Sequence, residues 1–313
     1  MQLLSWSSAA KALFGLTVAR LLLAFLYRRL YRHLYYHPLV PGSVALITGG
    51  GSGMGLEFAR YFARAGCHVV LVGRDADALR SALASCVELG SPSAEMVVAD
   101  LNTIEGTNLV CFGLRDIIEQ KRLHGQFRYL VLNAGLGAIL PFSSGVHFYE
   151  TCESVMQINY FANVRLLQGL LSLLEETHSA ANPSRVIVVS SLAGVLPSVL
   201  RSAYTASKHA IQGFANALRG ETEVAITLFC PGYVDTDFHS KATLIKGDGA
   251  PVTSHRRGMA PDVAVGKCME GVLSGRSEVL TPFVGKLGYI LRPLFTRLVD
   301  SRAKKMSHRS LQK

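Results

Sequence analysis

Tyr204 and Lys208 stand four residues apart in the stretch SAYTASKHA, residues 202–210. On a helix, residues at i and i+4 share a face, so the two side chains would lie alongside each other. A free tyrosine has a pKa of about 10, but a fixed cation nearby favours its phenolate form. Such a tyrosine could exchange a proton with an alcohol or a ketone. The alternative for this spacing alone is a surface pair on an amphipathic helix.

The elements that must position this pair alternate short β-branched runs with longer helical stretches from Leu39 onward. Near-continuous apolar strands separated by helices are typical of a parallel sheet covered on both faces. The chain is therefore predicted to have an α/β fold, a doubly wound parallel sheet in a single domain. The predicted strands are 43–48, 68–72, 94–99, 129–133, 185–190 and 224–229, and the predicted helices are 55–66, 75–90, 105–123, 147–176 and 203–220.

A glycine-rich loop, TGGGSGMG at 48–55, follows the first predicted strand directly. Such a turn between a strand and a helix lets the backbone approach a pyrophosphate, which then sits on the helix N-terminus. The spacing of Gly49, Gly53 and Gly55 is TGxxxGxG rather than GxGxxG. The alternative for a glycine-rich loop is simply a tight turn.

The ends of the second and third strands bear on the choice of nucleotide. An acid after the second strand would accept from a ribose 2′-hydroxyl, whereas a guanidinium suits a 2′-phosphate. This chain has Gly73 and then Arg74, which favours NADP(H). Asp100, after the third strand, could meet the adenine or could cap a helix.

Five motifs then occur in one order between residues 48 and 236: TGGGSGMG, LNAG, SSLAG, YTASK and PGYVDT. Together they resemble the short-chain dehydrogenase/reductase family. The resemblance implies a Rossmann-type sheet and an NADP-dependent enzyme that acts on CH–OH and C=O groups.

The resemblance also implies catalytic roles. Ser191, thirteen residues before Tyr204, would orient the substrate carbonyl, with Ser190 as the adjacent candidate. Tyr204 would give its proton to the developing alkoxide, while Lys208 would lower the tyrosine pKa and hold the nicotinamide ribose. Asn159, in QINYFANV, would keep a water-linked proton relay to the lysine.

The predicted cofactor contacts combine the glycine loop, the strand ends and the matched motifs. Ser52 and Met54 stand in the loop where NADP enzymes of the family often carry a basic residue. The full predicted set for NADPH or NADP is Gly49, Ser52, Gly53, Met54, Gly55, Arg74, Asp100, Leu101, Asn133, Ala134, Gly135, Tyr204, Lys208, Pro231, Gly232, Val234 and Thr236.

The bulk composition excludes some function classes. The formal charge is +10 and the pI is near 9.4, but the basic residues concentrate at the two ends and in one late loop. This distribution argues against nucleic-acid binding. It suits the binding of an anionic membrane, cofactor or substrate. Six cysteines show no CxxC spacing and no metal-ligand cluster is visible, so no metal site or disulfide framework is predicted.

The N-terminus predicts a membrane anchor. Residues 12–26 are strongly apolar apart from Arg20, and tyrosines and three arginines follow them. A spanning helix needs about 20 apolar residues, so both a spanning and an interfacial anchor stay open. The arginines against Lys11 place the following domain in the cytosol, with the endoplasmic reticulum as the expected membrane. The domains are then 1–38 for the anchor, 39–282 for the catalytic domain and 283–313 for an amphipathic basic extension.

Substrate choice should depend on the segment 237–261, whose basic residues could meet an anionic head group or keep a loop soluble. The stretch 277–299 could lie in a membrane interface beside the active site. A lipid-like substrate follows, and GLEFAR, INY and LTPFVG resemble 3-ketosphinganine reductases. The alternatives are acyl- or alkyl-dihydroxyacetone-phosphate reductases, hydroxysteroid or retinol dehydrogenases, and a non-catalytic NADP(H)-binding scaffold. Family resemblance also suggests a homodimer or tetramer.

Overall fold

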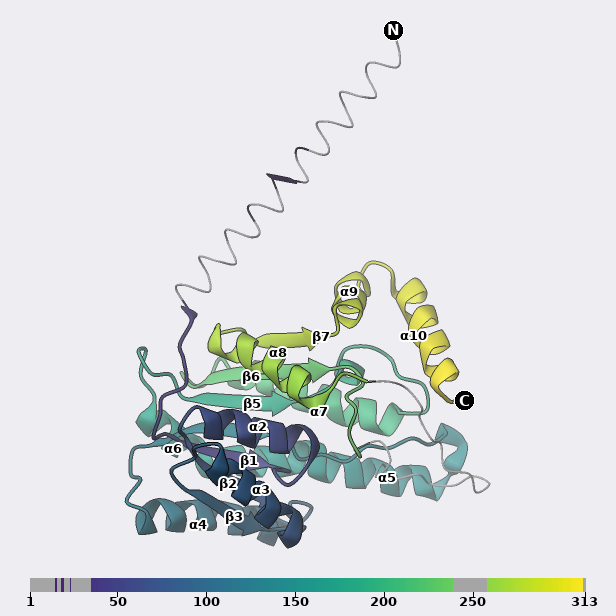
Figure 1. Ribbon diagram of the computed structural model, residues 1–313. Coiled ribbons are helices and arrows are strands. Elements are labelled where there is room, and N and C mark those ends of the chain that lie inside the picture. The colour runs from purple at the N-terminus through teal and green to yellow at the C-terminus, as the bar shows by residue number, and fades with distance from the viewer. Residues whose placement is uncertain (1–14, 16–17, 20–22, 24–34, 239–257, 312–313) are drawn as a thin grey trace.

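A seven-stranded parallel sheet, in the order β3-β2-β1-β4-β5-β6-β7, forms the centre of the molecule in a computed structural model (Figure 1). The structure describes residues 15, 18–19, 23, 35–238 and 258–311. The order reverses between β1 and β4, which makes the Rossmann-type topology predicted from the sequence. The strands are β1 (Val44–Thr48), β2 (His68–Gly73), β3 (Ala94–Val98), β4 (Phe127–Leu132), β5 (Arg185–Val189), β6 (Ala225–Pro231) and β7 (Glu278–Thr281).

Helices cover both faces of the sheet. One core cluster joins the strands to α4, α6 and α7, and a second joins them to α2, α3 and α8 (Figure 1). Alternate residues of a strand point to opposite faces, so Val44 and Leu46 enter the first cluster while Ala45 and Ile47 enter the second. The helices are α2 (Gly53–Arg64), α3 (Ala76–Glu88), α4 (Ile104–Gln120), α5 (Val146–Met156), α6 (Ala162–Thr177), α7 (Ser202–Leu218), α8 (Pro261–Leu273), α9 (Phe283–Leu291) and α10 (Thr296–Leu311).

The structure confirms the six predicted strands and corrects the last part of the chain. Pro261–Leu273 forms α8, and Glu278–Thr281 adds β7 to the edge of the sheet beside β6. Neither element was predicted. For β7 the reason is its length, because a strand of four residues has little hydrophobic pattern of its own. The predicted helix at 147–176 is interrupted by a π-helical segment, Gln157–Phe161, which separates α5 from α6.

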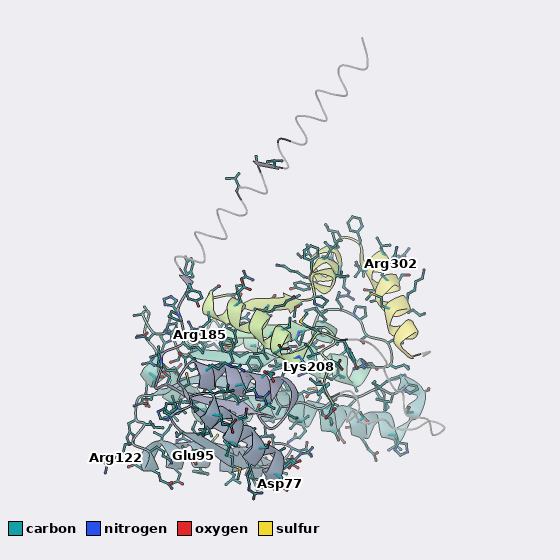
Figure 2. All side chains as sticks on the ribbon, viewed as in Figure 1. Asp77, Glu95, Arg122, Arg185, Lys208 and Arg302 are labelled. Carbon is teal, nitrogen blue, oxygen red and sulfur yellow. The ribbon has the colours of Figure 1, made fainter. Side chains whose placement is uncertain are left out.

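A strap formed by residues 35–42 crosses the amino-terminal edge of the sheet. The His37 amide donates to Leu273 O at 2.9 Å, and Arg185 Nη2 donates to His37 O at 2.7 Å. The Val40 amide donates to Tyr129 Oη at 2.8 Å. Figure 2 shows Arg185 at this edge, where its side chain is almost fully buried. The strap is therefore held to the catalytic domain by directional bonds.

Within the part of the chain that the structure describes, no helix is both long enough and apolar enough to cross a bilayer. The apolar run 12–26 is described only at Gly15, Val18, Ala19 and Leu23, so the predicted anchor lies almost wholly outside the described residues. The same holds for most of the predicted substrate segment, 239–257, with its basic residues Lys241, Lys246, His255, Arg256 and Arg257.

Candidate active site

A cavity of about 1530 Å³ opens at the carboxyl ends of the strands. In open parallel sheets, ligands bind at this edge where the strand order reverses. Of the predicted site residues, all but Gly55 and Asn159 line the cavity. Residues that are far apart in the sequence are thus brought to one place because β1, β2, β4, β5 and β6 all end there.

The glycine loop forms a cradle at the start of α2. Gly49 and Gly53 have φ of 67° and 53°, which glycine adopts without strain. A Cβ on Gly55 would lie 1.9 Å from Gly49 O, so this glycine lets the loop close against the helix instead of lining the cavity. Ser52, the residue before α2, makes no side-chain cap hydrogen bond. The first amides of α2 therefore fit an anionic group such as a pyrophosphate.

Thr48 ties the ends of β1 and β4 together beneath this loop. Its hydroxyl accepts from the amides of Asn133 and Ala134, each at 2.9 Å, and donates to Val131 O at 3.2 Å. Asn133 Nδ2 donates to Thr48 O at 3.0 Å. Thr48 was not among the predicted site residues, although its place before the first glycine of the loop could have indicated it.

The strand ends beside the loop supply polar side chains. Arg74 lies exposed at the carboxyl end of β2 on the cavity wall, without an ion pair among the described residues. Asp100 Oδ1 accepts from the Asn102 amide at 3.0 Å. The cap of α4 is Thr103, whose hydroxyl accepts from the Gly106 amide at 2.9 Å, so the capping alternative for Asp100 is wrong. Its contact with adenine stays a prediction.

The residues from 231 to 236 cover the loop from the other side. Pro231 ends β6, and the Gly232 amide donates to Thr281 O at 2.6 Å, which holds this segment to β7. A Cβ on Gly53 would lie 3.2 Å from Thr236 Cγ2, so Thr236 closes over the glycine loop. Val234, also on the cavity wall, forms a bridge with Met259.

Tyr204 and Ser191 meet across the cavity. Tyr204 and Lys208 lie one turn apart on α7, and the Tyr204 and Ser191 side chains are hydrogen-bonded. Ser191 Oγ also accepts from the Ala193 amide at 3.1 Å, which fixes it at the end of β5. Ser190 is engaged elsewhere, because its Oγ accepts from Gln212 Nε2 at 2.7 Å. This geometry favours Ser191 over Ser190 as the partner of the phenol.

The pKa of Tyr204 departs from the sequence-based expectation. Burial raises it above its usual value; the hydrogen bond with Ser191 and the charge of Arg201 lower it by less. Lys208 Nζ lies 5.8 Å from the centre of the Tyr204 ring, and burial lowers the pKa of this lysine to about 8. The prediction that Lys208 makes the phenol unusually acidic is wrong in this structure, because desolvation outweighs the nearby charges.

Asn159 and Lys208 are buried polar side chains that are hydrogen-bonded to the segments around the site. Asn159 is fully buried in the π-helical segment, where its Oδ1 accepts from the Leu136 amide at 2.8 Å and its Nδ2 donates to Ser207 Oγ at 2.9 Å. Lys208 Nζ donates to Val189 O at 2.9 Å. A Cβ on Gly135 would lie 2.9 Å from Asn159 Oδ1 and 3.5 Å from Lys208 Nζ, so the glycine leaves room between them. The proton relay through Asn159 stays a prediction.

The remaining wall of the cavity is mostly apolar and comes largely from the stretch 277–299, which is expected from the sequence to lie beside the active site. Gly285 of α9 packs tightly on the turn after Ser191, because a Cβ there would lie 2.2 Å from Leu192 Cδ1. This wall could bind an extended apolar molecule beside Tyr204. It includes Leu192, Leu196, Val199, Val284, Leu287, Leu291, Leu298, Val299 and Met306.

Comparison with known proteins agrees with this arrangement. Residues 43–245 match the family model described as short chain dehydrogenase. The chain is 32% identical over 323 residues to a dehydrogenase/reductase SDR family member 7B of Xenopus laevis, covering 97% of this chain and 94% of that protein. A Dictyostelium discoideum dehydrogenase/reductase SDR family protein 7-like is 29% identical and covers 86% of this chain and 83% of its own length.

Solved structures show the same fold. L-sorbose reductase from Gluconobacter frateurii, complexed with NADPH and L-sorbose, is 26% identical with a TM-score of 0.63, over 78% of this chain and 96% of that chain. A short-chain dehydrogenase from Sphingobium yanoikuyae in complex with NADPH is 22% identical with a TM-score of 0.67, over 85% and 95% of the two chains. The fold, the residues gathered at the cavity and these matches show that the chain belongs to the short-chain dehydrogenase/reductase family of oxidoreductases.

Proposed function

We propose that the chain is an NADPH-dependent reductase of a long-chain ketone that partitions into membranes, with 3-ketosphinganine as the first candidate substrate. The observation that carries this proposal is the cavity, which joins the glycine cradle and Tyr204 to a long apolar wall. Its volume of about 1530 Å³ exceeds the roughly 300–1000 Å³ of an ordinary ligand pocket, which leaves room for a dinucleotide and a bulky substrate together.

The choice of NADPH has two supports. Arg74 presents a guanidinium at the end of β2, and no acid takes the place of Gly73 beside it. The two solved structures named above are also complexes with NADPH. The glycine loop and the unpartnered first amides of α2 would hold the pyrophosphate, and Lys208 would hold the nicotinamide ribose. When bound, the nicotinamide supplies the hydride for reduction.

The protein's own residues would handle the proton. Ser191 and the Tyr204 hydroxyl converge on one point of the cavity, where both can bond a carbonyl oxygen and hold it in place. As negative charge develops on that oxygen, the Tyr204 hydroxyl gives it a proton. The raised pKa of Tyr204 keeps the phenol protonated at neutral pH, which is the form that this step requires.

A phosphate-bearing ketone is the second candidate, as in acyl- or alkyl-dihydroxyacetone-phosphate reductases. Arg201 and Arg302 both line the cavity, from the start of α7 and from α10. Figure 2 shows Arg302 on α10, and Lys208 by the sheet. The two arginines place positive charge in the substrate half of the cavity, where it would favour a phosphate.

A steroid or retinoid is a third candidate. A hydroxysteroid 11-beta-dehydrogenase 1-like protein of Gallus gallus is 32% identical over 221 residues, covering 69% of this chain and 72% of that protein. The apolar wall would accept either a rigid ring system or an alkyl chain.

Residues 12–26 would anchor the enzyme at the endoplasmic reticulum with its catalytic domain in the cytosol. Support comes from the three arginines Arg28, Arg29 and Arg32 after this apolar run against Lys11 before it. A homodimer or tetramer remains part of the proposal through family resemblance alone.

The test is a substrate screen with the purified full chain in detergent micelles. NADPH and NADH are compared with 3-ketosphinganine, an acyl-dihydroxyacetone phosphate, a ketosteroid and retinal, and nucleotide oxidation is followed by absorbance. Tyr204→Phe should lower turnover roughly 10²- to 10⁴-fold while NADPH still binds. Tyr149→Phe, the same change on an exposed side chain of α5, should leave turnover unchanged.

Absence of NADPH oxidation with every lipid ketone would remove the proposal. Unchanged turnover in Tyr204→Phe would remove the mechanism. An intact NADPH complex without turnover, together with an unchanged cellular effect of Tyr204→Phe, would favour the non-catalytic scaffold.

A further inference from the structure

Helix α9 and the turn that leads from it into α10 carry an exposed apolar surface outside the cavity, here called the outer apolar face. It consists of side chains that do not line the cavity and that a globular core would normally bury. Phe283 is 73% exposed, Ile290 57%, Leu294 77% and Phe295 53%, and Tyr289 lies beside them. Four of these five residues fall within Tyr289–Phe295, at the end of α9 and in the turn before α10.

The same two helices form a wall of the cavity with other residues. Along α9, Val284, Leu287 and Leu291 line the cavity, and along α10, Leu298 and Met306 do so. These positions recur at helical spacing, so each helix presents one side to the cavity. Among the described residues, α9 therefore has cavity-lining side chains on one side and contributes other side chains to the outer apolar face. α9 itself is fixed to the site, since Gly285 packs on Leu192 beside Ser191.

The sequence of α9 and α10 also carries an excess of positive charge. Between Phe283 and Met306 the sequence has six lysines and arginines against one acid, Asp300, which pairs with Arg292 at 2.8 Å. The other five cations are Lys286, Arg297, Arg302, Lys304 and Lys305. Exposed aromatic and aliphatic side chains on helices rich in lysine and arginine are typical of a surface that sits in the interface of an anionic membrane.

The amino-terminal chain joins the molecule on the same flank. A Cβ on Gly275, in the turn before β7, would lie 3.6 Å from Tyr35 Cβ. The continuous part of the described chain thus starts beside the amino end of β7, while α9 and α10 follow its carboxyl end (Figure 1). The 34 residues before Tyr35 include the apolar run 12–26. The strap and the outer apolar face therefore both adjoin β7, at its amino and carboxyl ends.

We propose that the outer apolar face docks on an anionic phospholipid bilayer, and that the lipid ketone passes between the bilayer and the cavity alongside α9 and α10. The strap at the other end of β7 would help to keep the β7 edge toward the membrane. The docking surface stands on the observations above, and the passage of substrate rests on the proposed function.

Docking is tested with the full chain in vesicles by fluorescence quenching. Leu294→Cys is labelled with an environment-sensitive fluorophore, and Leu109→Cys on α4, 50% exposed, is the matched control. Both carry Cys152→Ser, because the other five cysteines are buried. Vesicles of phosphatidylcholine, with or without phosphatidylserine, contain nitroxide-labelled lipid. We expect quenching at 294 that increases with phosphatidylserine and no quenching at 109. Equal quenching at both positions, or none at 294, would overturn the docking surface.

Substrate passage is tested with two ketones. The variant Ile290→Ser/Phe295→Ser should raise KM for a vesicle-borne long-chain ketone by about tenfold, because its lost apolar contacts weaken docking. Its kcat/KM for a short water-soluble ketone should stay unchanged, which shows that the fold and the catalytic residues are intact. Leu109→Ser/Phe112→Ser, with similarly exposed side chains on α4, should match the unsubstituted enzyme with both ketones.

The outcomes separate this inference from the proposed function. If vesicle-borne ketone is reduced but Ile290→Ser/Phe295→Ser has the KM of the unsubstituted enzyme, lipid does not pass along α9 and α10, and the proposed function stands. If no lipid ketone is reduced while the label at 294 is quenched, the proposed function fails and only the docking surface remains.

Discussion

Replacing Gly194 by any residue with a Cβ is predicted to destabilise the protein, because the buried side-chain amide of Gln212 occupies the space that the Cβ would need. Gly194 ends the short turn Leu192–Gly194, and a Cβ there would lie 2.0 Å from Gln212 Nε2 and 2.9 Å from Ser190 Oγ. Gln212 is 7% exposed, and its Nε2 donates to Ser190 Oγ at 2.7 Å and to Ser191 O at 3.4 Å. In Gly194→Ala the new methyl group must displace this amide and break both bonds.

The cost can be worked out from these contacts. Forcing a methyl group into a packed site costs roughly 1–3 kcal/mol. Each lost hydrogen bond adds about 1 kcal/mol, and the displaced Gln212 amide remains buried. A loss of about 3–5 kcal/mol in the free energy of unfolding follows, which corresponds to roughly 6–10 °C in Tm at about 2 °C per kcal/mol for a domain of this size. Turnover should fall as well, since the broken bonds lead to Ser190 and Ser191.

Thermal and urea unfolding of four variants checks this reasoning. Gln212→Ala removes the side chain that the new methyl group strikes, so Gly194→Ala should cost about 1–2 kcal/mol less in the double variant than alone. Gly213→Ala is the control, because a Cβ there has nothing within 4 Å. Additive effects of the first two substitutions, or a Tm for Gly194→Ala equal to that of the unsubstituted protein, would refute the steric account.

Three further predictions follow from the site. Arg74→Ala should weaken the affinity for NADPH roughly 10- to 100-fold and leave the affinity for NADH unchanged, as measured by calorimetry. An equal loss of affinity for both nucleotides would contradict the contact with the 2′-phosphate. A similar loss in the exposed control Arg80→Ala would contradict it as well. Burial lowers the pKa of Lys208 from 10.5 to about 8, so the folded protein binds this proton less well than the unfolded chain does. The free energy of unfolding should therefore rise with pH between about 8 and 10.5. Urea unfolding of Lys208→Met should show a flatter rise with pH, and identical slopes for the two proteins would contradict this account. Gly55→Ala would bring a Cβ within 1.9 Å of Gly49 O, a backbone atom that can move only if the loop itself moves. This variant should weaken NADPH binding by at least about tenfold in the same calorimetric assay. Unchanged affinity would show that the loop can shift and still bind the pyrophosphate.

The behaviour of Tyr204 shows what a motif leaves undecided. YTASK places a phenol and an ammonium on one face of a helix, and the structure confirms that placement. The motif could not show that both groups are buried together, at 6% and 3% exposure. Burial disfavours both charged forms, so it raises the pKa of the phenol and lowers that of the lysine. Spacing predicts which groups meet, whereas desolvation depends on everything packed around them.

Local pattern was enough to determine the sheet and the place of the chemistry. Runs such as VALIT and RVIVV specify buried parallel strands because each must be apolar on both faces. The glycine loop and YTASK could be placed because their chemistry requires particular residues at short, fixed spacing. Parallel strands that end at one edge then bring these motifs together whatever the details of the loops.

Contacts between distant residues decided the rest. β7 has only four residues and forms because it pairs in parallel with β6. Gln212 can support Ser191 only because α7 packs against the end of β5. α9 becomes a wall of the cavity because Gly285 lets it approach Leu192. Such contacts join residues that lie far apart along the chain, so no local window of the sequence contains the packing energy that selects them.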